Sequence, residues 1–373
     1  MALLTGLTAD GIEVPVQVRP DGALVAEGLE GAPGATGATG PQGAPGATGA
    51  TGPAGPPGLG IAPWLVSSWT AQASAADIEW RGICWSPELM LFAAVANTGS
   101  GDHVMTSPDG INWTTRASAT DNEWWFISWS PELMLFAAVA STGSGNRVMT
   151  SPDGINWTIQ ASAADNEWRS ICWSPELMLF AAVANTGSGN RVMTSPDGIN
   201  WTAQASAADN GWRSISWSPE LMLFAAVANT GSGNRVMTSP DGINWTTRAS
   251  AANNEWRSIS WSPELMLFAA VANSGSGNRV MTSPDGINWT TQASAADIGW
   301  WTISWSPELM LFAAAAYTGS GNRVMTSPDG INWTTRASAV DNEWRAICWS
   351  PERMLFAAVA TSGSGDRVMT SRT

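Results

Sequence analysis

The chain has 373 residues, a formal net charge of −14 and 17 basic residues, all of them arginine. This negative charge argues against nucleic acid or an anionic membrane surface as a partner, because both would repel the protein. No apolar run approaches the roughly 18 residues that a membrane-spanning helix needs, so we expect no membrane insertion. The only histidine is His103, which argues against a histidine-based metal or catalytic site, and we expect no cofactor.

Residues 1–30 predict a β-hairpin. The segments VPVQV and ALVAEGL have apolar residues at alternate positions, and the turn sequence RPDG separates them. A two-stranded hairpin is marginally stable alone, so we expect it to need partners that bury its apolar face. The opening MALLTGLTAD has no basic region and only a short apolar run, so we do not expect it to act as a secretory signal peptide.

Residues 31–60 have glycine at every third position for ten triplets. Only glycine fits the crowded axis of three wound polyproline-like chains, so this period predicts a collagen-like triple-helical stem. The alternative, a flexible Gly/Pro linker, has no reason to keep the period. At about 3 Å per residue the stem would span roughly 90 Å. A triple helix requires a homotrimer, and we expect the N-terminal hairpin to set its register and to anchor the chain.

The remaining residues, 61–373, form an array of repeats with a period of 44 residues. The octapeptide SPDGINWT first begins at Ser107 and occurs six times, whereas WSPE first begins at Trp85 and occurs seven times. Each repeat has four short segments rich in Trp, Val, Ile, Phe and Thr, and each segment ends in Pro or Gly turn residues. Four strands at this period are typical of one blade of a β-propeller.

The unequal numbers of the two motifs predict how the ring closes. The chain ends RVMTSRT, so the seventh repeat stops where the other repeats turn through SPDG. Trp69 and Thr70 lie 44 residues before Trp113 and Thr114 and have no blade in front of them. They would supply the missing last strand, and pairing the two ends removes the exposed edges of an open array. We therefore predict an all-β fold, a seven-bladed β-propeller closed by pairing of the two ends, preceded by the stem and the hairpin.

Three cysteines, Cys84, Cys172 and Cys348, occupy the same position in three different repeats, and the sister repeats have serine there. Separate repeats should place these residues too far apart, or in the wrong orientation, for the disulfide limit of about 7 Å between Cα atoms. We predict small buried free thiols rather than a redox pair or a metal site.

The SPDGINWT motif resembles a shortened Asp-box, the Ser-x-Asp-(x)-Gly-x-x-Trp turn between the third and fourth strands of sialidase-like propeller blades. The resemblance covers residues 64–373 and implies that one aspartate per box holds its turn. These structural residues would be Asp109, Asp153, Asp197, Asp241, Asp285 and Asp329. Sialidases need an arginine cluster, a tyrosine nucleophile and an acid, each placed once, whereas this chain has one tyrosine, Tyr317, and nearly identical blades. We expect no enzymatic activity.

The order of hairpin, collagen-like stem and terminal head resembles the fibre proteins of tailed bacteriophages. The stretch LTADGIEVPVQVRPDGALVAEGL, followed by GAPG, is similar to the start of such fibres, cyanophage ones among them. This resemblance, over residues 1–60, implies a homotrimer that assembles in the host cytoplasm and joins another virion protein through its N-terminus. The propeller would attach to a glycan or protein on the host surface. A capsid or tail decoration fibre without a specific ligand, and a cellular lectin, remain alternatives.

Variation among the repeats indicates which face of the propeller binds. Because chain direction alternates within a blade, the SPE and SPDG turns should share one face, and the TGSG and AADNE loops the other. The SPE and SPDG turns are invariant in every complete copy, and the differences cluster near the second set. The chain break falls inside the SPDG turn, so the stem should join the constant face and the variable face should point outward.

The predicted ligand-binding residues lie on this variable face. Exposed aromatic residues mark binding surfaces, and tryptophan beside arginine suits an uncharged or acidic sugar chain. The predicted set is Trp125, Phe126, Trp301, Tyr317, Arg81, Arg169, Arg213, Arg257, Arg345 and His103. The rival explanation is drift in tolerant loops, with most tryptophans in the core between blades and many arginines paired with neighbouring acids.

Overall fold

The computed structural model describes residues 4–7, 13–18, 24–26, 66 and 68–371. The chain divides into two units, Met1–Gly55 and Pro56–Thr373. The collagen-like stem predicted for residues 31–60 lies outside the described residues. Within the described part of the chain, no helix is long and apolar enough to cross a membrane.

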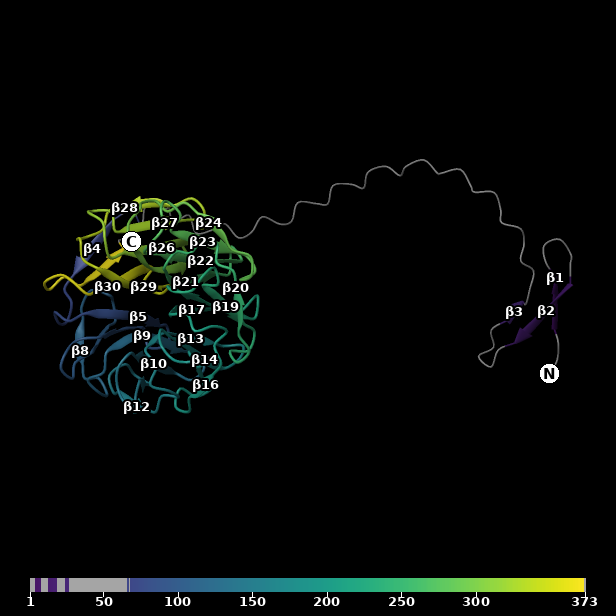
Figure 1. The fold of residues 1–373 in the computed structure, drawn as a ribbon, viewed down its shortest axis with the longest axis horizontal. Helices are drawn as coiled ribbons and strands as arrows, with labels where there is room; N and C mark the ends of the chain where they lie inside the picture. Colours follow the sequence, from purple (N-terminus) through teal and green to yellow (C-terminus); the bar gives the residue numbers. More distant parts are fainter. Residues whose placement is uncertain (1–3, 8–12, 19–23, 27–65, 67, 372–373) are drawn as a thin grey trace. The chain divides into compact units, whose positions relative to one another are not determined.

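The N-terminal unit contains a three-stranded antiparallel sheet (Figure 1). Its strands are β1 (Leu4–Leu7), β2 (Glu13–Val18) and β3 (Leu24–Ala26). Val16 lies opposite Ala26 in the β2–β3 pair, which is the hairpin expected in this segment, and Leu4 lies opposite Val16 in the β1–β2 pair. The sequence analysis did not predict β1, because a four-residue strand with a central glycine has too short a pattern to recognise.

The second unit is a ring of seven four-stranded antiparallel sheets, in each of which neighbouring strands are hydrogen-bonded in order from the innermost to the outermost. Blade 1 consists of β5 (Trp80–Ser86), β6 (Leu91–Ala96), β7 (Val104–Ser107) and β8 (Thr114–Arg116). Blade 2 consists of β9 (Trp124–Ser130), β10 (Leu135–Ala140), β11 (Val148–Ser151) and β12 (Thr158–Gln160). Blade 3 consists of β13 (Trp168–Ser174), β14 (Leu179–Ala184), β15 (Val192–Ser195) and β16 (Thr202–Gln204). Blade 4 consists of β17 (Trp212–Ser218), β18 (Leu223–Ala228), β19 (Val236–Ser239) and β20 (Thr246–Arg248).

The last three blades repeat this pattern and include the seam of the ring. Blade 5 consists of β21 (Trp256–Ser262), β22 (Leu267–Ala272), β23 (Val280–Ser283) and β24 (Thr290–Gln292). Blade 6 consists of β25 (Trp300–Ser306), β26 (Leu311–Ala316), β27 (Val324–Ser327) and β28 (Thr334–Arg336). Blade 7 consists of β29 (Trp344–Ser350), β30 (Leu355–Ala360), β31 (Val368–Ser371) and β4 (Trp69–Gln72). Figure 1 shows innermost strands such as β5 and β17 near the middle and outer strands such as β12 and β20 at the rim.

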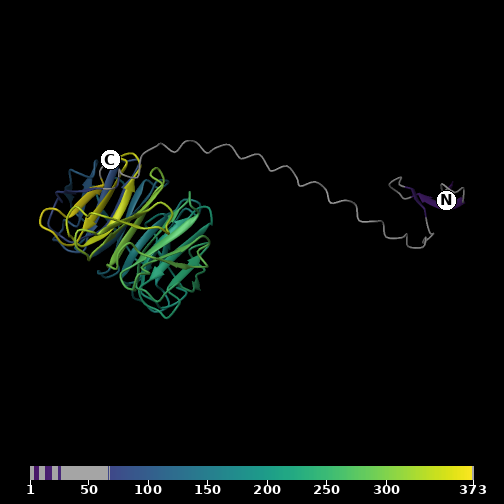
Figure 2. The same cartoon turned by 90° about the horizontal axis from the view of Figure 1, so that it is seen from above.

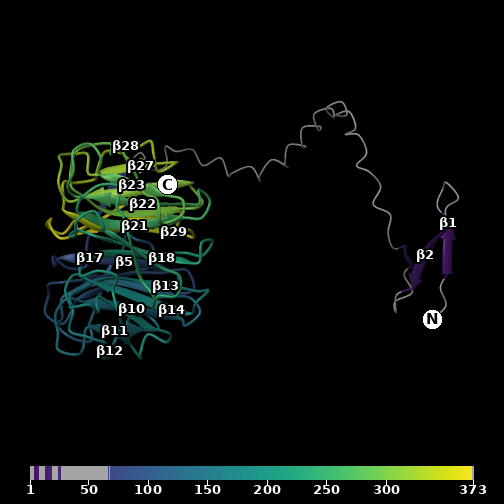
Figure 3. The same ribbon diagram turned by 45° about the vertical axis from the view of Figure 1, so that its right-hand side comes forward.

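The two ends of the array pair in blade 7, as the unequal motif numbers predict. β4 is antiparallel to β31, with Trp69 opposite Ser371 and Gln72 opposite Val368. Figures 1 and 2 show the blue N-terminal strands of the propeller beside the yellow C-terminal strands at this seam. Because β29 also contacts β5, the ring of innermost strands is continuous, and Figure 3 shows the stacked sheets from another side.

The core lies between adjacent blades. The second strand of each blade reads LFAAVA, or LFAAAA in blade 6, and its alanines let the neighbouring sheet approach closely. The first tryptophan of every blade fills the space between two sheets and has no exposed surface. These tryptophans are Trp80, Trp124, Trp168, Trp212, Trp256, Trp300 and Trp344. The expectation that most tryptophans belong to the inter-blade core is confirmed for the described residues.

The WSPE motif links each blade to the one before it. The indole nitrogen of Trp129 donates to a carboxylate oxygen of Glu88 at 2.7 Å, and Trp85 donates to Glu352 across the seam at 2.6 Å. The other five pairs are Trp173–Glu132, Trp217–Glu176, Trp261–Glu220, Trp305–Glu264 and Trp349–Glu308. Since each bond joins the tryptophan of one copy to the glutamate of another, both residues must stay constant in all copies for the ring to be linked throughout.

The Asp-box turns are held by their aspartates. Asp109 accepts bonds from the backbone nitrogens of Ile111 and Asn112, at 2.9 and 2.8 Å, and from the side chain of Asn112 at 2.8 Å. Gly110 has a φ of 74°, which a glycine adopts without strain. Burial opposes the charge of Asp109, but the bonds from Asn112 and Ile111 outweigh it and lower the pKa of Asp109 to about 2. The other five aspartates have the same bonds and pKa values of about 2: Asp153, Asp197, Asp241, Asp285 and Asp329.

Candidate functional site

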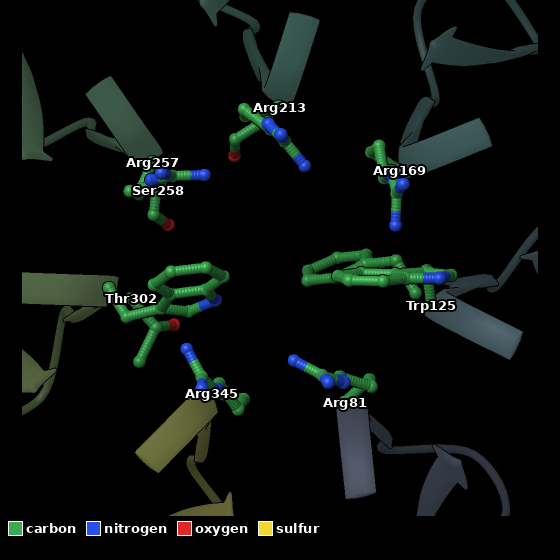
Figure 4. A pocket seen from close by; sticks show the side chains of 11 residues that line it. Arg81, Trp125, Arg169, Arg213, Arg257, Ser258, Thr302 and Arg345 are labelled. Carbon is green, nitrogen blue, oxygen red and sulfur yellow. The ribbon is translucent and has the colours of Figure 1, made fainter. Parts of the chain in front are cut away.

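Seven equivalent side chains converge at one mouth of the central channel. Each is the second residue of the innermost strand of its blade, directly after the loop that enters the blade. In ring order these residues are Arg81, Trp125, Arg169, Arg213, Arg257, Trp301 and Arg345, and all of them line one pocket. Figure 4 shows Arg213 between Arg169 and Arg257 on one side of the opening, with Arg81 and Arg345 on the other.

A β-bulge aims each of these side chains into the channel. In blade 1, Trp80 lies opposite Ala96 and Gly82 lies opposite Val95, so Arg81 is an extra residue without a partner on β6. The same shift in register occurs in all seven blades, and in each blade the unpaired residue is the one that lines the channel mouth. A bulge bends its strand and redirects one side chain. The repeated bulge therefore explains how one position per blade builds the opening.

Both tryptophans of the ring are stacked between arginines. The Arg169 guanidinium lies 3.8 Å from the centroid of the Trp125 ring, and that of Arg81 lies 4.6 Å from it. Trp301 lies between Arg257 at 4.6 Å and Arg345 at 4.2 Å. Such cation–π contacts fix the indole rings and spread the arginines around the opening.

Four of the five arginines are paired with a glutamate two residues earlier in the chain. Arg81 binds Glu79 at 2.7 Å, and the other pairs are Arg169–Glu167, Arg257–Glu255 and Arg345–Glu343. In blade 4 the equivalent residue is Gly211, and Arg213 has no hydrogen bond or ion pair within the part of the chain that the structure describes. Burial, together with the like charges of Arg257 and Arg169, lowers the pKa of Arg213 to about 9.

In blade 6, the ring tryptophan is accompanied by changes at two neighbouring positions. Tyr317 packs edge-on against Trp301 with 5.1 Å between ring centroids, and its own ring lies 4.7 Å from the Arg345 guanidinium. Gly299 gives Tyr317 its space, because a Cβ atom at Gly299 would lie 2.3 Å from Cε1 of the tyrosine. Most sister repeats have asparagine at the position of Tyr317 and glutamate at the position of Gly299, as in Asn185 and Glu167 of blade 3.

Blade 2 shows the same kind of matching. The Trp125 indole nitrogen donates to the Ser141 hydroxyl at 2.7 Å, and this serine replaces the asparagine of most sister repeats. Gly82 of blade 1 lets the backbone of blade 2 approach closely, because a Cβ atom there would be 2.8 Å from the Phe126 Cα atom and 3.0 Å from the Trp125 carbonyl oxygen. Independent drift of tolerant loops does not predict such paired changes, so they favour a site that has been shaped as a unit.

Hydroxyl groups line one side of the pocket just below the arginines. They belong to Ser214, Ser258 and Thr302, whereas Phe126 occupies the equivalent position in blade 2. The Ser214 and Ser258 oxygens each accept a bond from a backbone nitrogen of the next blade at 3.3 Å. Each hydroxyl therefore keeps its hydrogen for a ligand. Sequence reasoning missed these residues, because serine is also the commonest residue at this position in the array.

The opening is narrow and the channel below it is wide. Water can occupy about 40 Å³ between the side chains of the ring, compared with about 460 Å³ in the section lined by residues such as Ile83 and Trp129. Since one water needs roughly 10–15 Å³, the space between the ring side chains has room for about three waters. A small charged group fits between the arginines, and a whole sugar ring does not.

The three cysteines line the wall of the channel and form no disulfide, as predicted. The expectation that they are buried is met only in part: all three are half-buried, because their strand faces the wide section of the channel. Desolvation nevertheless raises the pKa of Cys84, Cys172 and Cys348 above the usual thiol value. Thiols of this kind are poor nucleophiles at neutral pH.

The structure corrects two parts of the predicted ligand-binding set. His103 is only 2% exposed and lies outside the pocket, with Nε2 3.2 Å from Asp121. It takes the place of arginines such as Arg147, which lies 3.5 Å from Asp165 in the next loop. Tyr317 also lies outside the pocket, where it packs against the side of Trp301. The remaining eight residues of the predicted set line the pocket together.

The predicted exposure of the aromatic residues is wrong. Trp125, Phe126, Trp301 and Tyr317 are all half-buried. The exposed large apolar side chains of the described residues lie instead on the constant face, at the isoleucine of SPDGI and the methionine of PELM. They are Ile111, Ile155, Ile199, Ile243, Ile287, Ile331, Met134, Met178, Met222, Met266 and Met310. Apolar exposure therefore does not distinguish the variable face. The argument that this face binds a ligand depends on the arginines and tryptophans that converge at the channel mouth.

Comparisons with known proteins show the fold alone. No protein family and no curated protein matches the sequence. A streptogramin B lyase structure matches with a TM-score of 0.68 and 8% identity, over 81% of this chain and 96% of that one. The GH74 enzyme of Niastella koreensis matches with a TM-score of 0.63 and 13% identity, over 81% of this chain and 53% of that one, so this chain spans about half of that enzyme. Hydrazine synthase of Kuenenia stuttgartiensis matches with a TM-score of 0.60 and 12% identity, over 80% and 97%.

Proposed function

We propose that the chain is a subunit of a homotrimeric bacteriophage fibre whose propeller attaches to a host-surface glycan. The observation that carries the proposal is the ring at the channel mouth. Two tryptophans are stacked between arginines there, and several of the differences among nearly identical repeats lie in or beside it. Because arginines cover the indole faces, a sugar at this mouth would meet the guanidinium hydrogen-bond donors and the edges of the indole rings.

The path of the chain supports this role for the propeller. Trp69 lies opposite Ser371, the residue from which the other blades turn through SPDG, so the chain enters the propeller on the constant face. The ring opens on the opposite face, where the innermost strands begin. A stem that joins the constant face leaves the ring free to meet a surface. The glycine period of residues 31–60 supports the trimer, and trimerisation would multiply weak binding by three heads.

We further propose that the head binds its ligand without changing it chemically. Four of the glutamates beside the ring are held in ion pairs with arginines, and Glu123 accepts a bond from Ser141 at 2.8 Å. Each of these carboxylates already has a partner in the protein, so none is free to exchange a proton with a ligand. Virion localisation and N-terminal attachment to another virion protein complete the proposal, on the resemblance of residues 1–60.

The test is binding of the full-length chain to host cells and to an array of bacterial surface polysaccharides. We expect Trp125→Ala and Trp301→Ala to weaken binding at least tenfold, with little change in melting temperature. Ile155→Ala, on the opposite face, is the matched control and should bind as the unchanged chain does. Silence across the array, with antibody labelling of the chain on virions, would instead support a decoration fibre. Loss of binding in the isoleucine variant alone would place the contact on the constant face.

A further inference from the structure

Three consecutive blades present an uninterrupted arc of arginines at the channel mouth. Arg169, Arg213 and Arg257 lie side by side between the two tryptophans of the ring (Figure 4). The Nε atom of each is buried and has no hydrogen-bond partner, and the same is true of one terminal nitrogen of Arg169. Buried donors without partners are rare in folded proteins, so this arc is arranged to receive an acceptor.

The charge around the ring is uneven. Five blades have a glutamate two residues before the ring position: Glu79, Glu123, Glu167, Glu255 and Glu343. Blades 4 and 6 have Gly211 and Gly299 instead, and blade 6 has a tryptophan in the ring, so only Arg213 loses its own carboxylate. Glu123 belongs to a blade without a ring arginine and adds its negative charge on the other side of Arg169. The excess positive charge is therefore local to Arg213.

The donors around Arg213 come from more than one plane. The guanidinium groups approach from three neighbouring blades, and the hydroxyls of Ser214 and Ser258 lie at the next residue of two of these blades. A carboxylate has two coplanar oxygens, which one or two arginines satisfy. A tetrahedral oxyanion has oxygens that point in several directions. It also fits the space of about 40 Å³, which excludes a sugar ring.

We propose that the Arg169–Arg213–Arg257 arc binds a tetrahedral oxyanion, the phosphate or sulfate ester of a surface polysaccharide. This inference rests on the proposed function and names the chemical group that the head recognises. The ester group enters the opening, and the sugar that bears it lies outside the opening, over the edges of the ring tryptophans. The site is single and off-centre, and the sevenfold repeat of the fold does not multiply it.

The test is calorimetric titration of the full-length chain with inorganic phosphate, sulfate and acetate at constant ionic strength. We expect saturable binding of phosphate and sulfate at one site per chain, and at least tenfold weaker binding of acetate. Acetate that binds as tightly as phosphate, or the absence of any saturable binding, would overturn the proposal.

The repeat itself supplies the matched variant. Gly211→Glu gives Arg213 the carboxylate that the four other arginines have, and should reduce phosphate affinity at least tenfold. A Cβ atom at Gly211 lies 2.6 Å from the amide oxygens of Asn185 and Asn229, which must rotate away. Arg213→Gln needs no such space and should have the same effect. Arg353→Gln removes a charge on the constant face and should leave binding unchanged. Equal phosphate affinity in Gly211→Glu, Arg213→Gln and the unchanged chain contradicts the site.

Two further measurements separate this inference from the proposed function and identify the source of the group. A chain that binds phosphate through Arg213 but does not bind host cells retains the oxyanion site and overturns the glycan-attachment role. A chain that binds cells equally well after Arg213→Gln retains the role and overturns the site. Vesicles containing phosphatidylglycerol test a lipid headgroup as the source of the group, and we expect no binding to them. Binding to these vesicles overturns a polysaccharide as the source.

Discussion

The two faces of the propeller are made from one repeat, yet they differ in how their polar groups are used. On the constant face, the glutamate of each SPE turn accepts a bond from a neighbouring blade, and each Asp-box carboxylate accepts bonds within its turn. On the variable face, three neighbouring arginines have buried nitrogens without partners. Satisfied polar groups stabilise a fold, whereas unsatisfied ones lower stability and are available to a ligand.

This difference suggests a general way to interpret tandem repeats. A residue that bonds to a different position of the neighbouring copy, as Trp129 bonds to Glu88, cannot change in one copy without losing that bond. A residue that faces the common axis can change alone if its neighbours make room, as Gly299 does for Tyr317. The invariant positions therefore indicate how the blades are joined, and the paired exceptions indicate where the protein is specialised.

The largest expected effect of a single change is on the bonds between blades. Glu220→Ala leaves the Trp261 indole nitrogen without its partner, and should lower the free energy of unfolding by about 1–3 kcal/mol. Glu352→Ala breaks the equivalent bond to Trp85 at the seam and should cost the same. Denaturant unfolding of both variants checks this. A much smaller loss of stability for Glu352→Ala would show that the two ends of the array are less firmly joined than the other blades. Loss of ligand binding in a variant that is still folded would contradict the assignment of stability to the constant face and of binding to the variable face.

A second, intermediate effect should appear in acid. The pKa of Asp153 is lowered to about 2 in the folded state, compared with about 3.9 in an unfolded chain. The unfolded chain therefore takes up protons first as the pH falls, so this stabilisation is complete above about pH 4 and is lost as the pH falls through 2. With six such aspartates, melting temperatures should fall steeply between pH 4 and pH 2.

Asp153→Asn is the matched variant for this pH dependence. The variant should be less stable than the unchanged chain at pH 7. The Asn156 side chain donates a hydrogen bond to the Asp153 carboxylate, and an asparagine at this position would present one acceptor oxygen fewer and an NH₂ donor in its place. The difference between the two proteins should shrink towards pH 2, where the carboxyl group is protonated in part. A difference that stays constant from pH 7 to pH 2 would contradict a charge-based role for this residue.

The sequence predicts much of the architecture because the repeat is so regular. The absence of PDG after Ser371 and the isolated Trp69 were enough to predict the pairing of β4 with β31. The partners of the invariant residues could not be predicted, since a residue present in every copy gives no indication of which copy it contacts. The Trp85–Glu352 bond is therefore a result of the structure alone.

The ring shows a similar division. Its seven residues could be selected because they differ among copies or repeat beside those differences, but their convergence depends on a bulge that no residue pattern revealed. The sequence did contain one indication that was missed. Glutamate precedes the ring arginine by two residues in four blades, and residues two apart on a strand share a face, so Gly211 already leaves Arg213 without a partner.

The smallest expected effect on stability is also the sharpest test of the variable face. Changing blade 6 to the common pattern requires Trp301→Arg, Tyr317→Asn and Gly299→Glu together. This combination already exists in blade 3 as Arg169, Asn185 and Glu167, so the triple variant should unfold within about 0.5 kcal/mol of the unchanged chain. Gly299→Glu alone should cost more, because its Cβ atom lies 2.3 Å from the Tyr317 ring and the ring must move. The effects of substitutions at contacting residues are not additive. The amount by which the summed losses of unfolding free energy of the single variants exceed the loss of the triple variant measures the coupling of these residues.

The triple variant should nevertheless lose ligand binding, since it removes one of the two stacked tryptophans. A triple variant that unfolds easily would show that Trp301 and Tyr317 serve the fold, and the difference between the two faces would then disappear.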